Sequence, residues 1–307
     1  MTHKKIYNSY GDWIRSVFPF RVQKIAVDAN LTCPNRDGYK ATGGCIYCLN
    51  QAFSPNYCQQ NLSITQQLDE GKKFFATKYP TMKYLAYFQA HSNTYAPIDH
   101  LKAIYKEALD SPDIVGLVIA TRPDCISENL LDFLEKLNSH TFIIIEYGVE
   151  STSDKTLKLI NRQHSFQQAA DALRLTKERG ITTGAHFILG LPGETEEFIL
   201  NQTKLINNLN IDILKLHQLQ ILKGTKLELM WQKQKFHTFQ LNEYIELIAK
   251  IIPKLRPDIV IERFTAQAPD NLLLAPKWGV KNHVFTQMLN KKLTLSNIFQ
   301  GSESSPQ

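Results

Sequence analysis

Three cysteines at metal-ligand spacing lie within sixteen residues of the chain, from Cys33 to Cys48. Two residues separate Cys45 from Cys48, and eleven residues separate Cys33 from Cys45. Thiolates two residues apart can close on one metal or cluster while the turn between them stays relaxed. Three thiolates leave a tetrahedral zinc site one ligand short, whereas a 4Fe-4S cluster held by three thiolates keeps one iron open to a small molecule. The spacing therefore predicts an iron–sulfur cluster with an open iron.

A zinc knuckle is the alternative interpretation of the same thiols. Cys58 follows Cys48 after nine intervening residues and would then be the fourth ligand. The two interpretations differ in the rest of the chain, because a knuckle predicts nothing downstream, whereas a cluster-binding barrel predicts a series of strands and helices. With a barrel present, Cys58 and Cys125 are interpreted as ordinary thiols, since a lone cysteine usually behaves as a small buried hydrophobe.

Strands and helices alternate through most of the chain. Strands are predicted at 23–30, 84–89, 115–121, 141–148, 182–189 and 212–222, and helices at 64–78, 98–109, 128–137, 154–160, 165–179 and 194–207. The apolar run 142–145 is typical of a parallel strand covered on both faces. The predicted fold class is α/β, a partial (β/α)6 parallel barrel over residues 23–225, with its chemistry at the C-terminal ends of the strands.

Smaller segments flank the predicted barrel. Residues 1–22 are rich in aromatics, which we interpret as a lid packed over one end of the domain, with a substrate stacking surface as the alternative. Residues 226–300 form a small α+β C-terminal extension, with helices predicted at 242–255 and 283–292 and a short strand at 259–263. The polar tail 301–307 is predicted to be disordered.

Composition limits the class of protein. A chain of 307 residues that is 43% hydrophobic can bury the core of one such domain. The opening residues lack a signal sequence and no apolar run approaches ~18 residues, so neither export nor a membrane span is predicted.

A cytoplasmic enzyme is expected. In the cytoplasm, clustered cysteines indicate metal binding or catalysis more often than disulfides. Lys plus Arg number 35 against 29 Asp plus Glu, a net charge of +6 that is compatible with a polyanion such as RNA without establishing one.

The cluster loop resembles that of the radical S-adenosylmethionine (radical SAM) enzymes. Tyr47 directly precedes the last cysteine, and the loop follows the first predicted strand. The commonest spacing in that family is Cys-x3-Cys-x2-Cys, and this chain has a longer first gap. The gap begins with Cys-Pro-Asn-Arg-Asp-Gly and ends with Gly-Gly-Cys-x2-Cys. This pattern resembles a bacterial subfamily that is close to the radical SAM core of elongator-type tRNA-modifying enzymes. The resemblance implies that Cys33, Cys45 and Cys48 bind a 4Fe-4S cluster that cleaves S-adenosylmethionine. The products are methionine and a 5′-deoxyadenosyl radical that abstracts hydrogen from the substrate.

The resemblance also implies which residues contact S-adenosylmethionine. After the second strand the family carries a polar loop, often Gly-Gly-Glu, that holds the methionine amine. Gln89, Ser92 and Asn93 stand there in this chain, and a solvated polar loop accounts for them equally well. Glu150 and Arg162 resemble the family residues that contact the ribose and the methionine parts of the cofactor. A carboxylate can accept from the ribose hydroxyls, and a guanidinium can bind the methionine carboxylate. A surface ion pair is the alternative.

The segment after the fifth strand matches the family's adenine-binding turn. Ile188 precedes Gly190-Leu-Pro-Gly-Glu-Thr, and the resemblance implies that Ile188 packs on adenine. Gly190 lets a planar ring approach backbone groups. His186 occupies a position where relatives often carry an acid or a histidine that faces the ribose, and a satisfied core histidine is the alternative.

Two further strand ends supply catalytic candidates. Arg122 follows the third strand, where a cation at a barrel mouth suits a carboxylate or phosphate. Lys215 and His217 alternate with leucines on the sixth strand and share one face. Since polar groups inside a barrel need a ligand or each other, they are the first candidates for substrate or cofactor contacts. Structural roles are expected for the more distant residues Glu262, Arg263 and Trp278, with closure over the substrate as the alternative.

The resemblance and the basic charge favour tRNA as the substrate. The implied reaction modifies the side chain at C5 of the wobble uridine, by conversion of carboxymethylaminomethyl to aminomethyl. A one-electron donor of the flavodoxin or ferredoxin type is implied. Radical chemistry on a small metabolite such as a porphyrin precursor is one alternative, and a zinc-stabilised RNA-binding protein without catalysis is another.

Overall fold

The computed structural model describes residues 5–76, 81–234 and 236–304. A sheet of seven strands, all parallel, runs through it in the order β1-β2-β3-β4-β5-β6-β8. The strands are β1 (Val22–Val27), β2 (Lys83–Phe88), β3 (Ile114–Thr121), β4 (Phe142–Glu150), β5 (Thr182–Leu189), β6 (Ile213–Gln218) and β8 (Val260–Arg263). A separate antiparallel pair joins β7 (Ile221–Leu222) to β9 (Leu273–Ala275).

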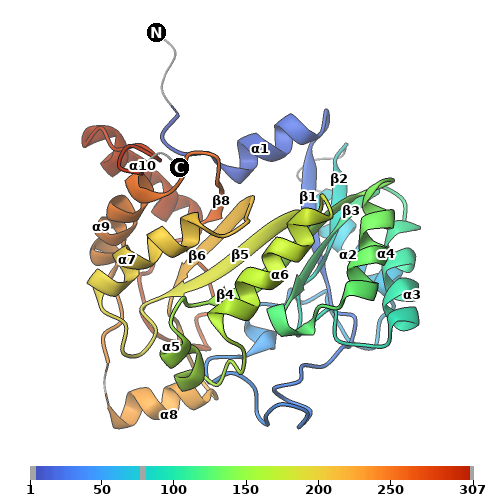
Figure 1. Cartoon of the computed structure of the whole chain (residues 1–307), viewed down its shortest axis with the longest axis horizontal. Helices are drawn as coiled ribbons and strands as arrows, with labels where there is room; N and C mark the ends of the chain where they lie inside the picture. Colours follow the sequence, from blue (N-terminus) through green and yellow to red (C-terminus); the bar gives the residue numbers. More distant parts are fainter. Residues whose placement is uncertain (1–4, 77–80, 235, 305–307) are drawn as a thin grey trace.

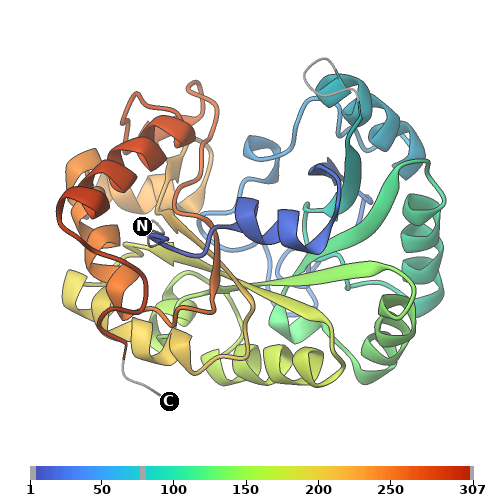
Figure 2. The same ribbon diagram turned by 90° about the horizontal axis from the view of Figure 1, so that it is seen from above.

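Helices cover the outside of the curled sheet, as Figures 1 and 2 show. The helices along the barrel are α2 (Ile64–Ala76), α3 (Ile98–Leu109), α4 (Glu128–Asn138), α5 (Asp154–Leu159), α6 (Phe166–Glu178) and α7 (Glu196–Asn207). Ser127, Ser153, Ser165 and Thr195 cap the last four of these by accepting a bond from the first turn, which fixes where each helix begins. This alternation of strands and helices confirms the predicted α/β parallel partial barrel.

The extension adds three helices after β6. They are α8 (Lys226–Lys233), α9 (Leu241–Ile251) and α10 (Asn282–Leu295). The strand predicted at 259–263 as part of this extension is β8, which pairs with β6 and becomes the seventh strand of the sheet. The strand predicted at 212–222 is divided, because Gln218 and Gln220 both bond to the backbone of Ala266 and the chain leaves the sheet there.

The N-terminal segment closes one end of the barrel. Helix α1 (Tyr10–Val17) crosses the end at which the strands begin, visible as the blue helix in the centre of Figure 2. Ile14 is buried there, and the rings of Trp13 and Phe18 contact Phe142 at the start of β4. The packing role expected for this segment is therefore the one observed. At the other terminus Glu303 bonds to Pro253, while residues 305–307 lie outside the described residues, as do 77–78 of the predicted helix 64–78.

Inward-facing side chains form layers, because alternate residues of each strand point to the same side. The layer above α1 is apolar and consists of Leu85, Val118, Ile144, Ile213 and Val260. Two residues further along four of these strands, the layer becomes polar, with Tyr87, Glu146, Lys215 and Glu262, joined by Lys24 of β1. The outward side chains pack under the helices in the main hydrophobic core.

The polar layer is a closed network of buried charges. The Lys24 Nζ lies 2.8 Å from Glu146 Oε1 and 2.7 Å from Glu262 Oε2. The Lys215 Nζ lies 2.5 Å from Glu146 Oε2 and 3.2 Å from Glu262 Oε1. Two ammonium groups thus face two carboxylates, and the Tyr87 hydroxyl accepts from Lys215 at 3.2 Å. Removing one member of such a set leaves an uncompensated buried charge, which costs about 3–5 kcal/mol.

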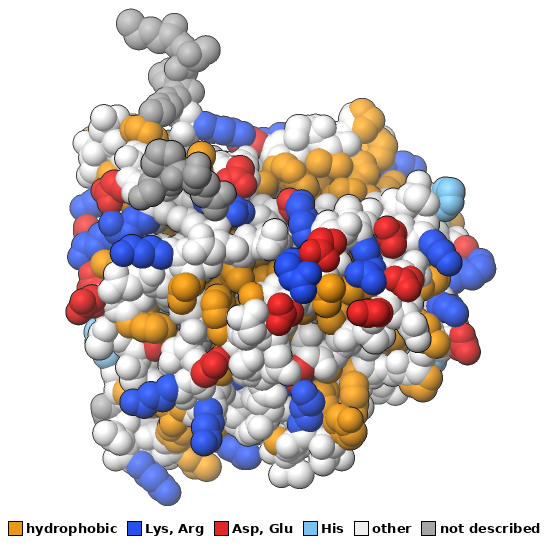
Figure 3. All heavy atoms as spheres, in the orientation of Figure 1, with side chains coloured by type: hydrophobic (Ala, Val, Ile, Leu, Met, Phe, Trp, Pro, Cys, Tyr) orange, Lys and Arg blue, Asp and Glu red, His pale blue; other side chains and the backbone are white. Residues whose placement is uncertain are grey.

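The surface carries charges of both signs. On the face shown in Figure 3, Lys and Arg side chains lie among Asp and Glu side chains. Many are neighbours on one helix, such as Lys106 with Asp110 and Arg174 with Glu178. Exposed pairs of this kind contribute little to stability, so the stability of the domain rests on its interior.

Two glycine substitutions test the packing of the barrel. A Cβ on Gly71 of α2 would lie 2.3 Å from Ile25 Cγ2 of β1, whereas a Cβ on Gly11 of α1 would meet nothing closer than 3.8 Å. Gly71→Ala should therefore lower the free energy of unfolding by about 1–3 kcal/mol through overpacking. Gly11→Ala should raise it by about 0.5–1 kcal/mol, as in an ordinary helix. Chemical denaturation of both variants checks this, and a stabilised Gly71→Ala would show that α2 does not pack as described.

Candidate active site

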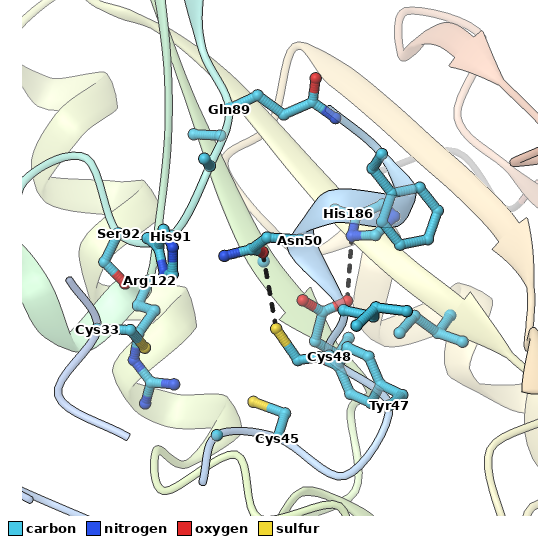
Figure 4. A pocket seen from close by; sticks show the side chains of 18 of the residues that line it. Cys33, Cys45, Tyr47, Cys48, Asn50, Gln89, His91, Ser92, Arg122 and His186 are labelled. Atoms are coloured by element: carbon cyan, nitrogen blue, oxygen red, sulfur yellow. Dashed lines mark hydrogen bonds and ion pairs between the residues drawn. The ribbon is translucent and has the colours of Figure 1, made fainter. Parts of the chain in front are cut away.

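A cavity opens where the barrel strands end, as the (β/α) arrangement predicts. Figure 4 shows its wall, with the sulfur atoms of Cys33, Cys45 and Cys48 around one space. Twelve of the fourteen residues predicted as site residues line this cavity: Cys33, Cys45, Cys48, Gln89, Ser92, Arg122, Glu150, Arg162, His186, Ile188, Lys215 and His217. The tertiary structure therefore gathers residues from six segments into one site.

The cysteine loop is held by donors that point at its sulfur atoms. The Arg162 guanidinium lies 3.6 Å from Cys45 Sγ, and the Asn35 amide lies 3.7 Å from the same atom. Arg36 lies 3.6 Å from Cys48 Sγ. Two guanidinium groups and an amide directed at sulfur suit anionic thiolates, and hydrogen bonds to sulfur are one of the means by which proteins tune iron–sulfur clusters.

This donor set fits a cluster. The three thiols border a common space, together with the guanidinium groups that are directed at them. The Cys58 thiol lies elsewhere, where it donates to the carbonyl of Ala26 at 3.0 Å. Burial raises the pKa of Cys58 and that of Cys125 to about 12, so both remain protonated thiols at neutral pH.

A line of contacts leads from Cys45 into the barrel. Arg162 donates to the carbonyl of Gly148 at 2.6 Å and lies 3.5 Å from Glu150 Oε1. Glu150 Oε2 lies 3.1 Å from His186 Nδ1. Glu150 has a φ of +70°, and the register of β4 shifts between Gly148 and Glu150. This irregularity at the end of the strand turns the carboxylate toward the cavity.

Burial and charge set the protonation states along this line. Burial raises the pKa of Glu150, but His186 and Arg162 lower it more, to about 2, so the carboxyl is ionised. Burial lowers the pKa of His186, and Glu150 opposes this only in part. Burial, then His186 and Arg263, hold the pKa of His217 well below its ordinary value. Both histidines are therefore neutral at pH 7, and their rings lie 4.5 Å apart.

Arg122 is buried and largely occupied by protein partners. It pairs with Asp124 through two bonds of 2.9 and 3.0 Å and donates to the carbonyl of Arg162 at 2.5 Å. Its remaining nitrogen, Nη1 (NH1), is buried without a partner among the described residues. One donor of this guanidinium is thus left for a group in the cavity.

Two predicted residues do not line the cavity. The Asn93 amide donates to the carbonyls of Phe88 and Ala120, and so ties the ends of β2 and β3 together. Gly190 has a φ of +86°, and a Cβ there would lie 2.9 Å from the ring of Phe239. Both positions are explained by packing.

Lys215 and His217 share one face, as predicted, and both find protein partners. Lys215 belongs to the polar layer, where burial lowers its pKa more than Glu146 and Glu262 raise it. His217 Nδ1 lies 2.7 Å from the carbonyl of Gln218 and therefore carries the proton, which leaves Nε2 as an acceptor. Ile188 is buried beside Tyr47 in a small apolar cluster at the cavity wall.

Several cavity residues were not predicted as site residues. Besides Arg122 and Ser92, polar atoms of four of them are buried without a partner in the described structure: Asn50 Nδ2, His91 Nδ1, Gln220 Oε1 and Arg263 Nε. Buried polar groups normally have hydrogen-bond partners, so their gathering at one cavity suits a ligand-binding site. His91, with a φ of +65°, lies in the same polar loop as Ser92, so the loop itself was the available signal.

Known proteins resemble this chain over all or part of its length. The uncharacterized protein YtqA of Bacillus subtilis (strain 168) is 31% identical over 298 residues, which cover 97% of this chain and 92% of that protein. A tRNA uridine(34) acetyltransferase of Methanocaldococcus infernus is 32% identical over 146 residues, which cover 46% of this chain and only 27% of that enzyme. The solved structure of Elp3 from the same archaeon superposes with a TM-score of 0.68 at 21% identity, over 91% of this chain and 64% of that one. This last likeness shows the fold.

Two family models account for the barrel and the extension. Residues 37–201 match the Radical SAM superfamily, and residues 211–294 match the Radical_SAM C-terminal domain. The chain therefore belongs to the radical SAM superfamily. It is an S-adenosylmethionine-dependent enzyme of the class that uses a 4Fe-4S cluster. Within the described residues, no helix combines the length and the apolar composition needed to cross a bilayer.

A half-buried acid in the turn after β5, Glu194, gives the stability of the protein a pH dependence. Burial raises the pKa of Glu194 to about 7, although the Ser151 hydroxyl, which donates to it at 2.6 Å, acts in the opposite direction. Since the ordinary pKa is 4.5, the folded state holds a proton that the unfolded state releases. The stability contributed by this group is therefore lost as the pH rises from about 4.5 to about 7.

Glu194→Gln should remove this loss, because the amide stays neutral and can still accept from Ser151. We expect the variant to exceed the wild type in unfolding free energy by about 1 kcal/mol at pH 8, and by much less at pH 5. Denaturant titrations at the two pH values measure this. Glu197→Gln, the same change at an exposed position of α7, is the control, and an equal effect of both substitutions would contradict the assignment.

Proposed function

We propose that this radical SAM enzyme modifies tRNA at the C5 side chain of the wobble uridine, with conversion of carboxymethylaminomethyl to aminomethyl as the specific reaction. The observation that supports tRNA as the substrate is the partial match to a tRNA uridine(34) acetyltransferase. The matched portion excludes about three quarters of that enzyme, so the proposal concerns a shared substrate and not a shared acetyl transfer. A cytoplasmic location and a flavodoxin- or ferredoxin-type electron donor belong to the same proposal.

Each part of the cavity has a proposed role. Cys33, Cys45 and Cys48 hold the cluster. Arg162 and the free NH1 of Arg122 supply guanidinium donors for the methionine carboxylate of the cofactor. The unpartnered hydroxyl of Ser92 and the amide of Gln89 face the same cavity and are suited to the methionine amine.

The deeper wall is suited to the nucleoside part of the cofactor. Glu150 is an ionised acceptor for ribose hydroxyls, with His186 beside it. Ile188 offers an apolar surface to adenine. When bound, the cluster and S-adenosylmethionine supply a 5′-deoxyadenosyl radical that abstracts a hydrogen atom. The protein positions the substrate and excludes water. Because His186 and His217 are buried and neutral at pH 7, neither is a cationic acid that could donate a proton at this wall.

The substrate is tested by the formation of 5′-deoxyadenosine. The reconstituted enzyme, with S-adenosylmethionine and a reductant, should form more of this product when tRNA from cells lacking the protein is added. Nucleoside analysis should show a changed wobble uridine. Equal formation with and without tRNA would retain the radical chemistry but refute tRNA as the substrate, and would turn attention to a small metabolite.

The cluster ligands are tested by paired substitutions. Cys45→Ala should abolish both the iron–sulfur absorbance and the formation of 5′-deoxyadenosine, because one of three thiolates is lost. Cys58→Ala, a matched change at the thiol that donates to Ala26, should retain both. Iron and sulfide analysis measures the outcome, and loss of the cluster from Cys58→Ala, or bound zinc in place of iron, would overturn the ligand set.

A further inference from the structure

Arg263 is a cavity-lining cation without an anionic partner. It ends β8, the seventh strand, and its neighbour Glu262 is engaged by Lys24 and Lys215. In the described structure no carboxylate lies within ion-pair distance of the Arg263 guanidinium, and its Nε is buried without a hydrogen-bond partner. Its one hydrogen bond is a long contact of 3.5 Å from NH2 to His186 Nε2.

Among the described residues, the other cations of the cavity wall have anionic or sulfur partners, although one nitrogen of Arg122 is free. Arg122 pairs with Asp124, Arg162 with Glu150, and Lys215 with Glu146. Arg36 is directed at the carbonyl and the sulfur of Cys48. Arg263 also lies at the far end of the contacts that run from Cys45 through Arg162, Glu150 and His186. Its free donors are therefore separated from the cysteines by three intervening side chains.

Unused acceptors lie on the adjoining wall. Gln220 is 5% exposed, donates its amide to Ala266 at 3.1 Å, and leaves its Oε1 buried without a partner among the described residues. His217 is neutral and has Nε2 as an acceptor. A guanidinium with free donors, in the same cavity as two neutral acceptors and with no described carboxylate within ion-pair distance, is suited to bind an anion that carries a nearby N–H or O–H group.

We propose that Arg263 and Gln220 form the subsite for an anionic group of the substrate, a carboxylate or a phosphate, with Arg263 binding the charge and Gln220 accepting from a neighbouring donor. The proposal deepens the proposed function and rests on it for the statement that the ligand is the substrate. The C-terminal extension, which supplies β8, then contributes directly to substrate recognition and does more than complete the barrel.

Small anions test the subsite without tRNA. Saturation-transfer NMR of the methyl protons would follow acetate, methyl phosphate and the neutral analogue acetamide on the reconstituted enzyme, with S-adenosylmethionine bound so that the cofactor's own carboxylate site is filled. Saturable binding of acetate or methyl phosphate, but not of acetamide, is expected. The tighter of the two anions identifies the group as carboxylate or phosphate.

Variants assign the binding to Arg263. Arg263→Gln should weaken anion binding roughly tenfold or more, because a charge-assisted pair is lost, and Arg263→Lys should restore part of it. Gln220→Leu should leave acetate binding nearly unchanged but weaken N-methylglycine, which carries a donor beside its carboxylate. Arg174→Gln, at an exposed position of α6, is the control for loss of a positive charge.

Two results would overturn the proposal. One is anion binding by Arg263→Gln equal to that of the wild type, or no saturable binding of either anion. The other is a matching loss of S-adenosylmethionine affinity, measured by equilibrium dialysis, which would assign Arg263 to the cofactor. Because these assays contain no tRNA, a negative tRNA experiment leaves their outcome unaffected, and the two proposals can fail separately.

Discussion

The interior of this barrel depends on the compensation of buried charge. Lys24, Glu146, Lys215 and Glu262 face one another between an apolar layer below and an open cavity above. Each of these ions would be costly alone, and the set is tolerable only because two cations meet two anions at short range. Lys24 belongs to β1 and Glu262 to β8, so the network also joins the first and last strands of the sheet, whose curvature brings them together.

The pairing of buried polar groups with protein partners ends at the next layer, where the cavity of the active site begins. Below, nearly every polar group has a protein partner. Around the cavity, Ser92, His91, Arg122, Gln220 and Arg263 keep buried polar atoms without one in the described structure. A fold optimised for stability alone would satisfy these atoms. These atoms lie at the strand ends, next to the cysteine loop, where they are open to a ligand.

The two family matches meet in this site. The segment matched by the superfamily model provides most of the cysteine loop, Glu150 and His186, while the segment matched by the C-terminal domain provides Lys215, His217 and Arg263. Helix α1 closes the opposite end by burying Ile14 against the apolar layer. The extension is thus part of the barrel wall.

The sequence by itself determined the elements and the local motifs. Apolar segments that alternate with helical ones predicted six of the seven parallel strands. The spacing of Cys33, Cys45 and Cys48 predicted the cluster loop. Both signals are carried by residues that are close together in the chain. The same periodicity placed Lys215 and His217 on one face. Only the tertiary structure decided that Lys215 faces Glu146, that 260–263 joins the sheet, that Asn93 and Gly190 serve packing, and that Arg263 stands unpaired at the cavity. Those outcomes depend on which strands become neighbours when the sheet curls. Contacts between residues as far apart in the chain as Glu146 and Lys215, which are separated by 69 positions, leave no local sequence pattern.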